Sequence, residues 1–83
     1  MRLEIISPEG LVFEGEVSSI SVPGMYSAFT ILKNHAPIIS SLSEGKVVYV
    51  LMDGKENELF VNGGFVEVGN NVVTICIEKS IEQ

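Results

Sequence analysis

The chain has few of the side chains from which catalytic and metal sites are built. Its 83 residues include one histidine, one cysteine and no tryptophan. An acid–base or nucleophilic site needs at least two reactive groups placed against each other, and a zinc site takes three or four ligands. The serines show no nucleophile-elbow pattern, and no glycine-rich loop opens a helix to cradle phosphate. The sequence therefore predicts a protein that is not an enzyme and has no catalytic, metal-binding or cofactor-binding residues.

Positive charge is also scarce. Five Lys and Arg residues stand against eleven Asp and Glu, which gives a formal net charge of -6, and the basic residues are scattered along the chain. Nucleic-acid binding needs a positive patch that releases counterions from phosphate, so it is excluded. An acidic surface aids solubility and would favour a basic protein partner, although a plain solvated face is the preferred interpretation.

Cysteine pairs and long apolar runs are absent as well. With Cys76 alone no internal disulfide forms, which predicts a protein made in a reducing compartment. The apolar setting "VVTICIEK" predicts that Cys76 is a buried, inert thiol. No apolar run reaches the roughly 18 residues that span a bilayer, and Glu4 interrupts a signal-peptide pattern, so we expect a soluble chain with no direct membrane insertion.

What the chain does have is a regular succession of short apolar segments. The composition, 46% hydrophobic and 19% charged, is that of a globular domain, and the length predicts one domain over residues 1–83. The segments are rich in Val and Ile and are bounded by Gly, Pro, Asn and Asp, which predicts an all-β, two-sheet β-sandwich of short, mainly antiparallel strands. We expect strands near residues 2–7, 11–22, 26–32, 38–43, 46–52, 57–62, 65–69 and 72–78.

Three turns have a recognisable chemistry. "SPEG" at residues 7–10 and Asp53-Gly54 predict tight reversals, and "GNNV" at residues 69–72 supplies side chains that tolerate positive φ. Gly63-Gly64 predicts a bulge, a bend or a close backbone approach. The offset of Val17 from Ile20 within "VSSISV" predicts a bulge or a crossing between sheets. The strand "VVTICI" is expected to be covered on both sides, and "KSIEQ" at the end is compatible with the start of a helix.

Lys55 and His35 can each be interpreted either as functional residues or as ordinary structural ones. Lys55 follows the Asp53-Gly54 turn, and small acidic β-domains can carry a lipoyl or biotinyl group on a hairpin lysine. The usual tetrapeptide and the internal repeat of such carriers are missing, so a solvated lysine is favoured, and an intact mass would distinguish the two. Taken alone, His35 is best explained by a hydrogen bond to a neighbouring backbone group at a turn.

Read together, the segments resemble one family. "LEIISPEGLVFEGEVSSISVPG", "FTILKNHAPIISSLSEGKVVYV" and "LFVNGGFVEVGNNVVTICIEKSI" are similar to the N-terminal β-domain of the epsilon subunit of F-type rotary ATP synthase. The resemblance rests on Phe13-x-Gly15 after the first turn, on "NHAP" before an apolar strand, and on the "GGFVEV" and "NNVVT" ending. It covers nearly the whole chain in order.

The resemblance implies a non-catalytic part of the rotor, in the central stalk. Ion flow, of protons or sodium, turns the ring of c subunits, and this domain helps to fix the ring to the gamma subunit. The complex would lie at the cytoplasmic face of the bacterial inner membrane, with this subunit peripheral. By position, the c-ring contact would comprise Met25, Tyr26, Ser27, Ala28, Asn34 and His35. The gamma-subunit contact would comprise Ser7, Ile38, Ile39 and Ser40.

The chain departs from the family pattern in two places. Where the family has a glycine-rich, acidic stretch, this sequence has Ser27 and Thr30 for the later glycines and Tyr26 and Ala28 for acidic residues. We therefore expect a more apolar contact, with Met25, Tyr26 and Phe29 as anchors. The family usually continues into two C-terminal helices, whereas this sequence ends at Gln83, which predicts no inhibitory arm and no nucleotide site. A cofactor carrier or a generic β-sandwich interaction module is the alternative from a different class.

Overall fold

The computed structural model describes residues 1–78, 80 and 81. They form strands, turns and loops, and the described residues contain no helix, so none that could cross a membrane. The nine strands are β1 (Arg2–Ser7), β2 (Gly10–Val22), β3 (Phe29–Leu32), β4 (Ile38–Leu42), β5 (Gly45–Leu51), β6 (Glu56–Val61), β7 (Gly64–Gly69), β8 (Val72–Ile77) and β9 (Ser80–Ile81).

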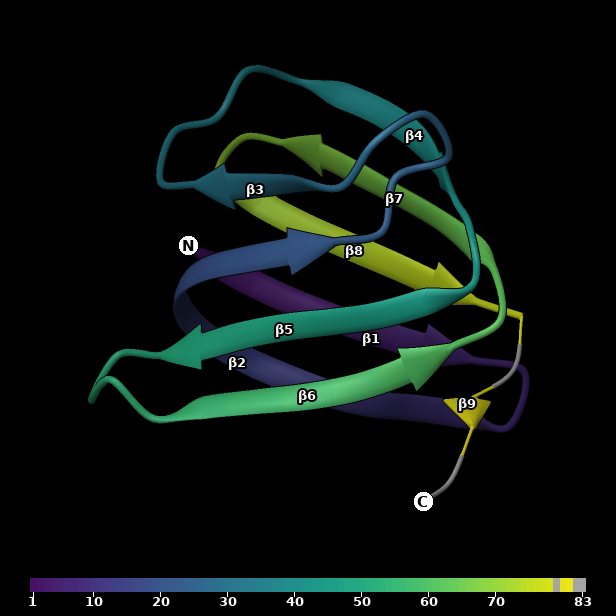
Figure 1. The fold of residues 1–83 in the computed structure, drawn as a ribbon. Coiled ribbons are helices and arrows are strands. Elements are labelled where there is room, and N and C mark those ends of the chain that lie inside the picture. Colours follow the sequence, from purple (N-terminus) through teal and green to yellow (C-terminus); the bar gives the residue numbers. More distant parts are fainter. Residues whose placement is uncertain (79, 82–83) are drawn as a thin grey trace.

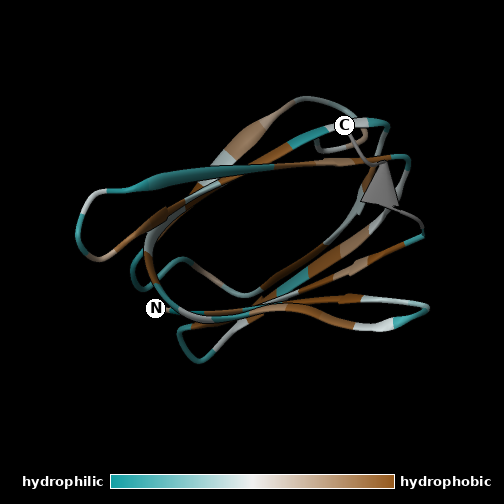
Figure 2. Ribbon diagram, turned by 90° about the horizontal axis from the view of Figure 1, so that it is seen from below, coloured by the Kyte–Doolittle hydropathy of each residue, from teal (hydrophilic) through white to brown (hydrophobic). Residues whose placement is uncertain are grey.

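The strands form two layers that share β2 (Figure 1). One layer, the first sheet, has the order β4-β7-β8-β1 and ends on the first half of β2. The other layer, the second sheet, contains β3, the second half of β2, β5, β6 and β9. Figure 2 shows the layers facing each other across the space that core side chains fill. The pairing of β1 with β8 is parallel and all the others are antiparallel, so the predicted, mainly antiparallel β-sandwich is confirmed.

The transfer of β2 from one sheet to the other depends on an irregularity near its middle. The register with β5 shifts between Val17 and Ser19, so that Val17 and Ile20 both face the core although they are three residues apart. A bulge of this kind bends the strand and increases its twist. Figure 1 shows the resulting sharp turn of β2. The sequence offset predicted a bulge or a crossing, and the structure contains both.

The core lies between the two sheets and consists of aliphatic side chains. Its fully buried members, with no accessible surface or almost none, are Leu3, Ile5, Val17, Ile20, Val22, Ile31, Val47, Val61, Val66, Val73 and Ile75. Phe13 of β2 meets Tyr49 of β5 with ring centroids 4.6 Å apart, and burial raises the pKa of the Tyr49 hydroxyl. The family motif Phe13-x-Gly15 has a steric basis here, because the Phe13 ring lies over Gly15, 3.1 Å from where a Cβ would be.

The predicted turns are confirmed. Residues 8–9 connect β1 to β2, and the Asp53-Gly54 turn connects β5 to β6. Asn70 (φ 52°) and Asn71 (φ 61°) both adopt the left-handed conformation that a two-residue hairpin turn needs. At Gly64 (φ 136°) a Cβ would lie 2.1 Å from the carbonyl oxygen of Cys76, so the double glycine marks a close backbone approach, as predicted.

Four expectations are corrected. The strand expected at residues 26–32 is only Phe29–Leu32, because the chain before it turns aside to pair with β4. Ser80–Ile81 is a strand paired with β6 and not the start of a helix, while the rest of "KSIEQ" lies outside the described residues. Strand β8 is buried on one side only. Its inward positions are Val73, Ile75 and Ile77, so Cys76 points outward and is half-buried instead of buried.

Candidate functional site

The loop of residues 23–28 is fixed at its base against the end of β4. Gly24 forms an isolated bridge with Leu42. The Met25 N–H donates to the Ser41 carbonyl at 2.9 Å, and the Ser43 N–H donates to the Pro23 carbonyl at 2.8 Å. A Cβ on Gly24 would lie 2.5 Å from the Ser27 carbonyl oxygen and 2.7 Å from the Phe29 ring, which leaves room for glycine alone. The loop therefore has a firm base although its tip is in solvent.

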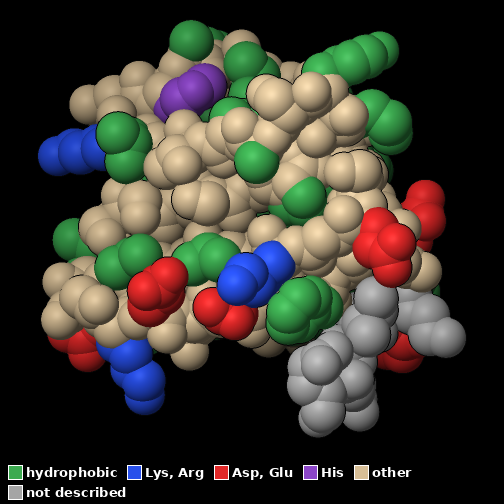
Figure 3. Space-filling model, in the orientation of Figure 1, with side chains coloured by type: hydrophobic (Ala, Val, Ile, Leu, Met, Phe, Trp, Pro, Cys, Tyr) green, Lys and Arg blue, Asp and Glu red, His purple; other side chains and the backbone are tan. Residues whose placement is uncertain are grey.

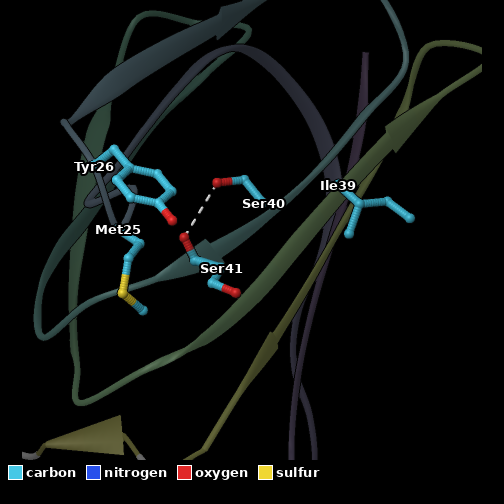
Figure 4. A pocket seen from close by; sticks show the side chains of 5 residues that line it. All are labelled: Met25, Tyr26, Ile39, Ser40 and Ser41. Atoms are coloured by element: carbon cyan, nitrogen blue, oxygen red, sulfur yellow. Dashed lines mark hydrogen bonds between the residues drawn. The ribbon is translucent and has the colours of Figure 1, made fainter.

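The tip of this loop presents apolar side chains to solvent. Tyr26 is 100% exposed and Met25 54%, and Ser27 and Ala28 are exposed as well. Beside the tip lies an open depression of about 450 Å³, lined by Met25, Tyr26, Ile39, Ser40 and Ser41. Figure 4 shows Met25 and Tyr26 on one side of it and Ile39 on the other, with the two serines between them. Phe29, predicted as a third anchor, is instead half-buried and packs against the core, because its ring lies over Gly24.

The bend that follows β3 is held by polar contacts. Asn34 has φ 62°, and its N–H donates to the side-chain oxygen Oδ1 of Asn71 at 3.0 Å. The His35 N–H donates to the Leu32 carbonyl at 3.1 Å. On the His35 ring, Nδ1 lies 2.8 Å from the Ala36 carbonyl, to which it donates. The hydrogen bond to a neighbouring backbone group that the sequence predicted for His35 is therefore present.

The structure divides the predicted c-ring residues into two groups. Met25, Tyr26, Ser27 and Ala28 lie before β3, whereas Asn34 and His35 lie after it. An extended strand of four residues is about 13 Å long, so the loop and the bend are at opposite ends of the sandwich (Figure 1). The loop instead lies beside Ile39 and Ser40, which were predicted to contact gamma.

The predicted gamma residues are also not equivalent. Within β4, Ile39 points outward and is 75% exposed, while Ile38 and Ser40 are half-buried, and Ile38 packs against the core. Ser7 lies on β1, separated from β4 by β8 and β7, which is about 14 Å at the usual strand spacing. The Ser7 hydroxyl accepts a hydrogen bond from the Glu9 N–H at 3.2 Å and so helps to form the turn.

The outward face of the second sheet is mixed in character. Lys46 lies 3.3 Å from the Glu58 carboxylate, and its ammonium is 5.9 Å from the centroid of the Phe60 ring. Figure 3, in the orientation of Figure 1, shows charged and hydrophobic side chains dispersed over this face. Exposed ion pairs of this kind contribute little to stability. The arrangement indicates an ordinary solvated surface.

The outward face of the first sheet was not predicted from the sequence. Arg2 on β1 donates to the carboxylates of Glu4 and Glu14, with the side-chain nitrogen Nε 3.2 Å from Glu4. The hydrogen bond to Glu4 is the main cause that raises the pKa of the exposed Arg2 guanidinium. Next to this polar group the register places a row of four apolar side chains on adjacent strands, of which Phe65, Ile6 and Leu11 are exposed and Cys76 is half-buried. Alternation within each strand indicated which residues point outward, but which strands are neighbours was not evident before the structure.

The site residues offer contact surface and no reaction chemistry. In residues 1–78 with 80 and 81, no three His, Cys, Asp or Glu side chains lie close enough together to hold a metal ion. His35 and Cys76 lie on different elements, the bend after β3 and strand β8, and neither is paired with a second reactive group in the contacts described above. Lys55 is exposed after its turn, where its N–H is bound by the Asp53 carboxylate at 2.9 Å.

Comparison with known proteins gives a consistent picture. A family model described as the β-sandwich domain of the ATP synthase delta/epsilon chain matches residues 1–83. The chain is 38% identical over 81 residues to the ATP synthase epsilon chain of a Nitratiruptor species, covering 98% of this chain and 63% of that relative. It is 40% identical over 77 residues to the epsilon chain of Chlorobium limicola, covering 93% of this chain and 88% of that relative.

Solved structures show the same fold. A chain of the Euglena gracilis mitochondrial ATP synthase superposes with a TM-score of 0.89 at 21% identity, over 95% of this chain and 51% of that one. A chain from the central stalk and c-ring of the Tetrahymena thermophila mitochondrial ATP synthase gives a TM-score of 0.82 at 17% identity, over 98% of this chain and 65% of that one. At these identities the likeness establishes the fold.

Proposed function

Because this chain belongs to the family of ATP synthase delta/epsilon β-sandwich domains, we propose that it is a non-catalytic rotor subunit of an F-type ATP synthase. In this role residues 1–83 act as one docking domain that couples rotation of the c-ring to the gamma subunit. The observation that carries the proposal is the family match over the whole chain, together with the 40% identity to an epsilon chain. The proposal covers a ring driven by protons or by sodium.

The geometry suits a part that transmits torque. A contact that transmits torque must deform little under load, and the loop of residues 23–28 has its base fixed by β4 while Met25 and Tyr26 project from it. Large apolar side chains on a firm support make efficient anchors. We assign this tip, with Ser27 and Ala28, to the c-ring contact. Asn34 and His35 would form a second and separate contact with the ring.

The gamma contact is assigned to the exposed edge of β4 and to the first turn. Ile39 is the projecting side chain, and Ser40 lies beside it in the depression next to Met25. Ile38 would support this surface from the core side, and Ser7, about 14 Å from β4, would form a separate contact with gamma at the β1–β2 turn. In this proposal the subunit lies at the cytoplasmic face of the bacterial inner membrane as a peripheral part of the complex.

Co-purification tests the proposal. The chain, carrying an affinity tag, is mixed at low salt with detergent-solubilised c-ring and with purified gamma chain from the same organism. We expect gamma and the c-ring to be retained together. Tyr26→Asp should reduce retention of the ring and leave gamma bound, since the side chain is assigned to the ring alone. Failure of the unmodified chain to bind purified gamma at low salt would contradict the proposal.

A further inference from the structure

A row of apolar side chains crosses the outward face of the first sheet. Phe65 on β7 is opposite Cys76 on β8, Cys76 is level with Ile6 on β1, and Ile6 is opposite Leu11 on β2. Phe65, Ile6 and Leu11 are exposed and Cys76 is half-buried. At the usual strand spacing the row is about 14 Å long. These four residues are called the apolar row below.

The bulge in β2 widens the row at one end. The register of β1 with β2 shifts between Ile5 and Ile6, which leaves Val12 as an extra residue between Leu11 and Phe13. Val12 is exposed, and it adds apolar surface next to Leu11. Contiguous exposed apolar surface on a small protein is characteristic of an interaction site.

Carboxylates lie on both sides of the apolar row. On one side lie Glu67 and Glu4, two residues from Phe65 and Ile6, and Glu14, which is three residues from Leu11 because of the bulge. On the other side Glu78 follows two residues after Cys76. Among the described residues of these strands, the only cation on this face is Arg2, which is bound to Glu4 and Glu14. The rim is therefore negative. A surface of this pattern complements a segment with apolar side chains between positive ones.

A second copy of the chain would be a poor occupant of this surface. Two copies would bring like-charged rims together, and like charges across an interface oppose association. Among the described side chains of the second sheet's strands, Lys46 is the one cation, and it is already paired with Glu58. The occupant that fits is a different, basic polypeptide.

We propose that the apolar row is a docking surface for a segment of the gamma chain in which apolar side chains are flanked by lysines or arginines. This inference rests on the proposed function and adds to it a surface, outside Ser7 and residues 38–40, with its own chemistry. Phe65, Ile6 and Leu11 supply the apolar contact, and Glu67 and Glu78 supply the charge complement. Cys76 lies between Phe65 and Ile6 in the apolar row, so its thiol is within the contact.

The single cysteine allows a direct footprint of this surface. The purified chain reacts with N-ethylmaleimide alone or with saturating gamma chain from the same organism, and intact mass gives the rate of alkylation at Cys76. We expect gamma to slow alkylation at least tenfold. The matched control is Cys76→Ser combined with Leu32→Cys, which moves the thiol to the outward face of the second sheet, where Leu32 is 57% exposed. Alkylation there should not change when gamma is added.

The outcomes separate this inference from the rotor proposal. If gamma co-elutes with the chain but Cys76 is not protected, or both thiols are protected equally, the apolar row is not the docking surface and the rotor proposal stands. If gamma does not co-elute with the unmodified chain, both proposals fail.

Substitutions in the apolar row give a second test. Leu11→Glu should weaken gamma binding at least tenfold, while Leu32→Glu should leave it unchanged. Phe65→Glu serves as a second variant if Leu11→Glu does not fold. If gamma binding does not change as the salt concentration rises from 50 to 300 mM, the carboxylates of Glu67 and Glu78 do not contribute to it.

Discussion

The two ends of β3 are held in place by different kinds of interaction. Before β3, the loop of residues 23–28 is fixed by close packing around Gly24 and by backbone hydrogen bonds to the end of β4. After β3, the bend at Asn34 and His35 is held by a side-chain oxygen of Asn71 and by short-range bonds at exposed positions. The loop presents apolar side chains from its tip and the bend presents polar ones.

The loop and the bend differ in how far binding can be changed without changing the stability of the fold. At the loop the residues that fix the backbone are buried or in the main chain, while Met25 and Tyr26 project freely. Substitutions at its tip should therefore alter binding alone. At the bend the same exposed polar groups both hold the backbone and face solvent, where water competes for their hydrogen bonds. Substitutions there combine a small loss of stability with any loss of contact.

Gly24→Ala should have the largest effect, because it removes the packing that fixes the loop. The added Cβ would meet the Ser27 carbonyl oxygen at 2.5 Å, and a backbone atom cannot move aside cheaply. We expect the free energy of unfolding to fall by about 1–3 kcal/mol. Urea unfolding followed by circular dichroism measures it. Gly69→Ala is the matched control, since a Cβ there has nothing within 4 Å. Equal stability of the two variants would show that the loop base is not tightly packed.

Tyr26→Asp should have the second largest effect, and should weaken assembly with the c-ring without changing the stability of the fold. The side chain is 100% exposed, so unfolding should stay within about 0.5 kcal/mol of the unmodified chain. Loss of an apolar anchor should weaken affinity for the c-ring about tenfold and reduce ion pumping for each ATP hydrolysed in membrane vesicles. Tyr26→Phe keeps the apolar ring and should behave as the unmodified chain. Normal coupling in Tyr26→Asp would remove the loop tip from the ring contact.

Much of the fold could be predicted from local sequence. Alternating Val and Ile, the Asp53-Gly54 turn and the Asn70-Asn71 turn fix strands and reversals through interactions between near neighbours, and the structure agrees with them. The short β3 could not be predicted. Residues 25–28 look extended, but their course is decided by the pairing of Gly24 with Leu42, eighteen positions later in the sequence. The outward orientation of Cys76 likewise depends on which side of β8 meets the core.

The grouping of the site was harder to predict than its residues. Ala28 and Asn34 are six positions apart, which suggests one surface, yet an extended strand places them at opposite ends of the sandwich. The apolar row was missed for the opposite reason. Phe65 and Cys76 are opposite each other in the β7–β8 hairpin, but Ile6 is far away in sequence and joins them only because β1 pairs in parallel with β8. Parallel pairing has no turn signature that a single sequence reveals.

Asn71→Ala should have a moderate effect, and at the bend only. It removes the acceptor of the Asn34 N–H and places alanine at φ 61°, a conformation that costs most residues about 1 kcal/mol. Asn71→Gly relieves the second cost and keeps the first. The difference between the two variants therefore measures the backbone cost, and comparing Asn71→Gly with the unmodified chain measures the loss of the hydrogen bond. We expect hydrogen exchange at the Asn34 amide to speed up in both, while exchange at the Met25 amide is unchanged. Faster exchange at Met25 would mean that the two ends of β3 are coupled.

His35→Ala should have the smallest effect on stability and is the sharpest test of the bend. The ring is half-buried, and among the described residues it bonds the neighbouring Ala36 carbonyl alone, so its removal should change the free energy of unfolding by less than about 0.5 kcal/mol. If the bend contacts the c-ring, coupling of ATP hydrolysis to ion pumping should still fall, by less than in Tyr26→Asp because less apolar surface is lost. His35→Asn retains a short polar side chain and should restore part of it. Two results would contradict a ring contact at His35: unfolding of His35→Ala seen by circular dichroism, or normal coupling of ATP hydrolysis to ion pumping in a stably folded variant. The role of the histidine would then be its hydrogen bond in the turn, and the c-ring contact would be confined to the loop before β3.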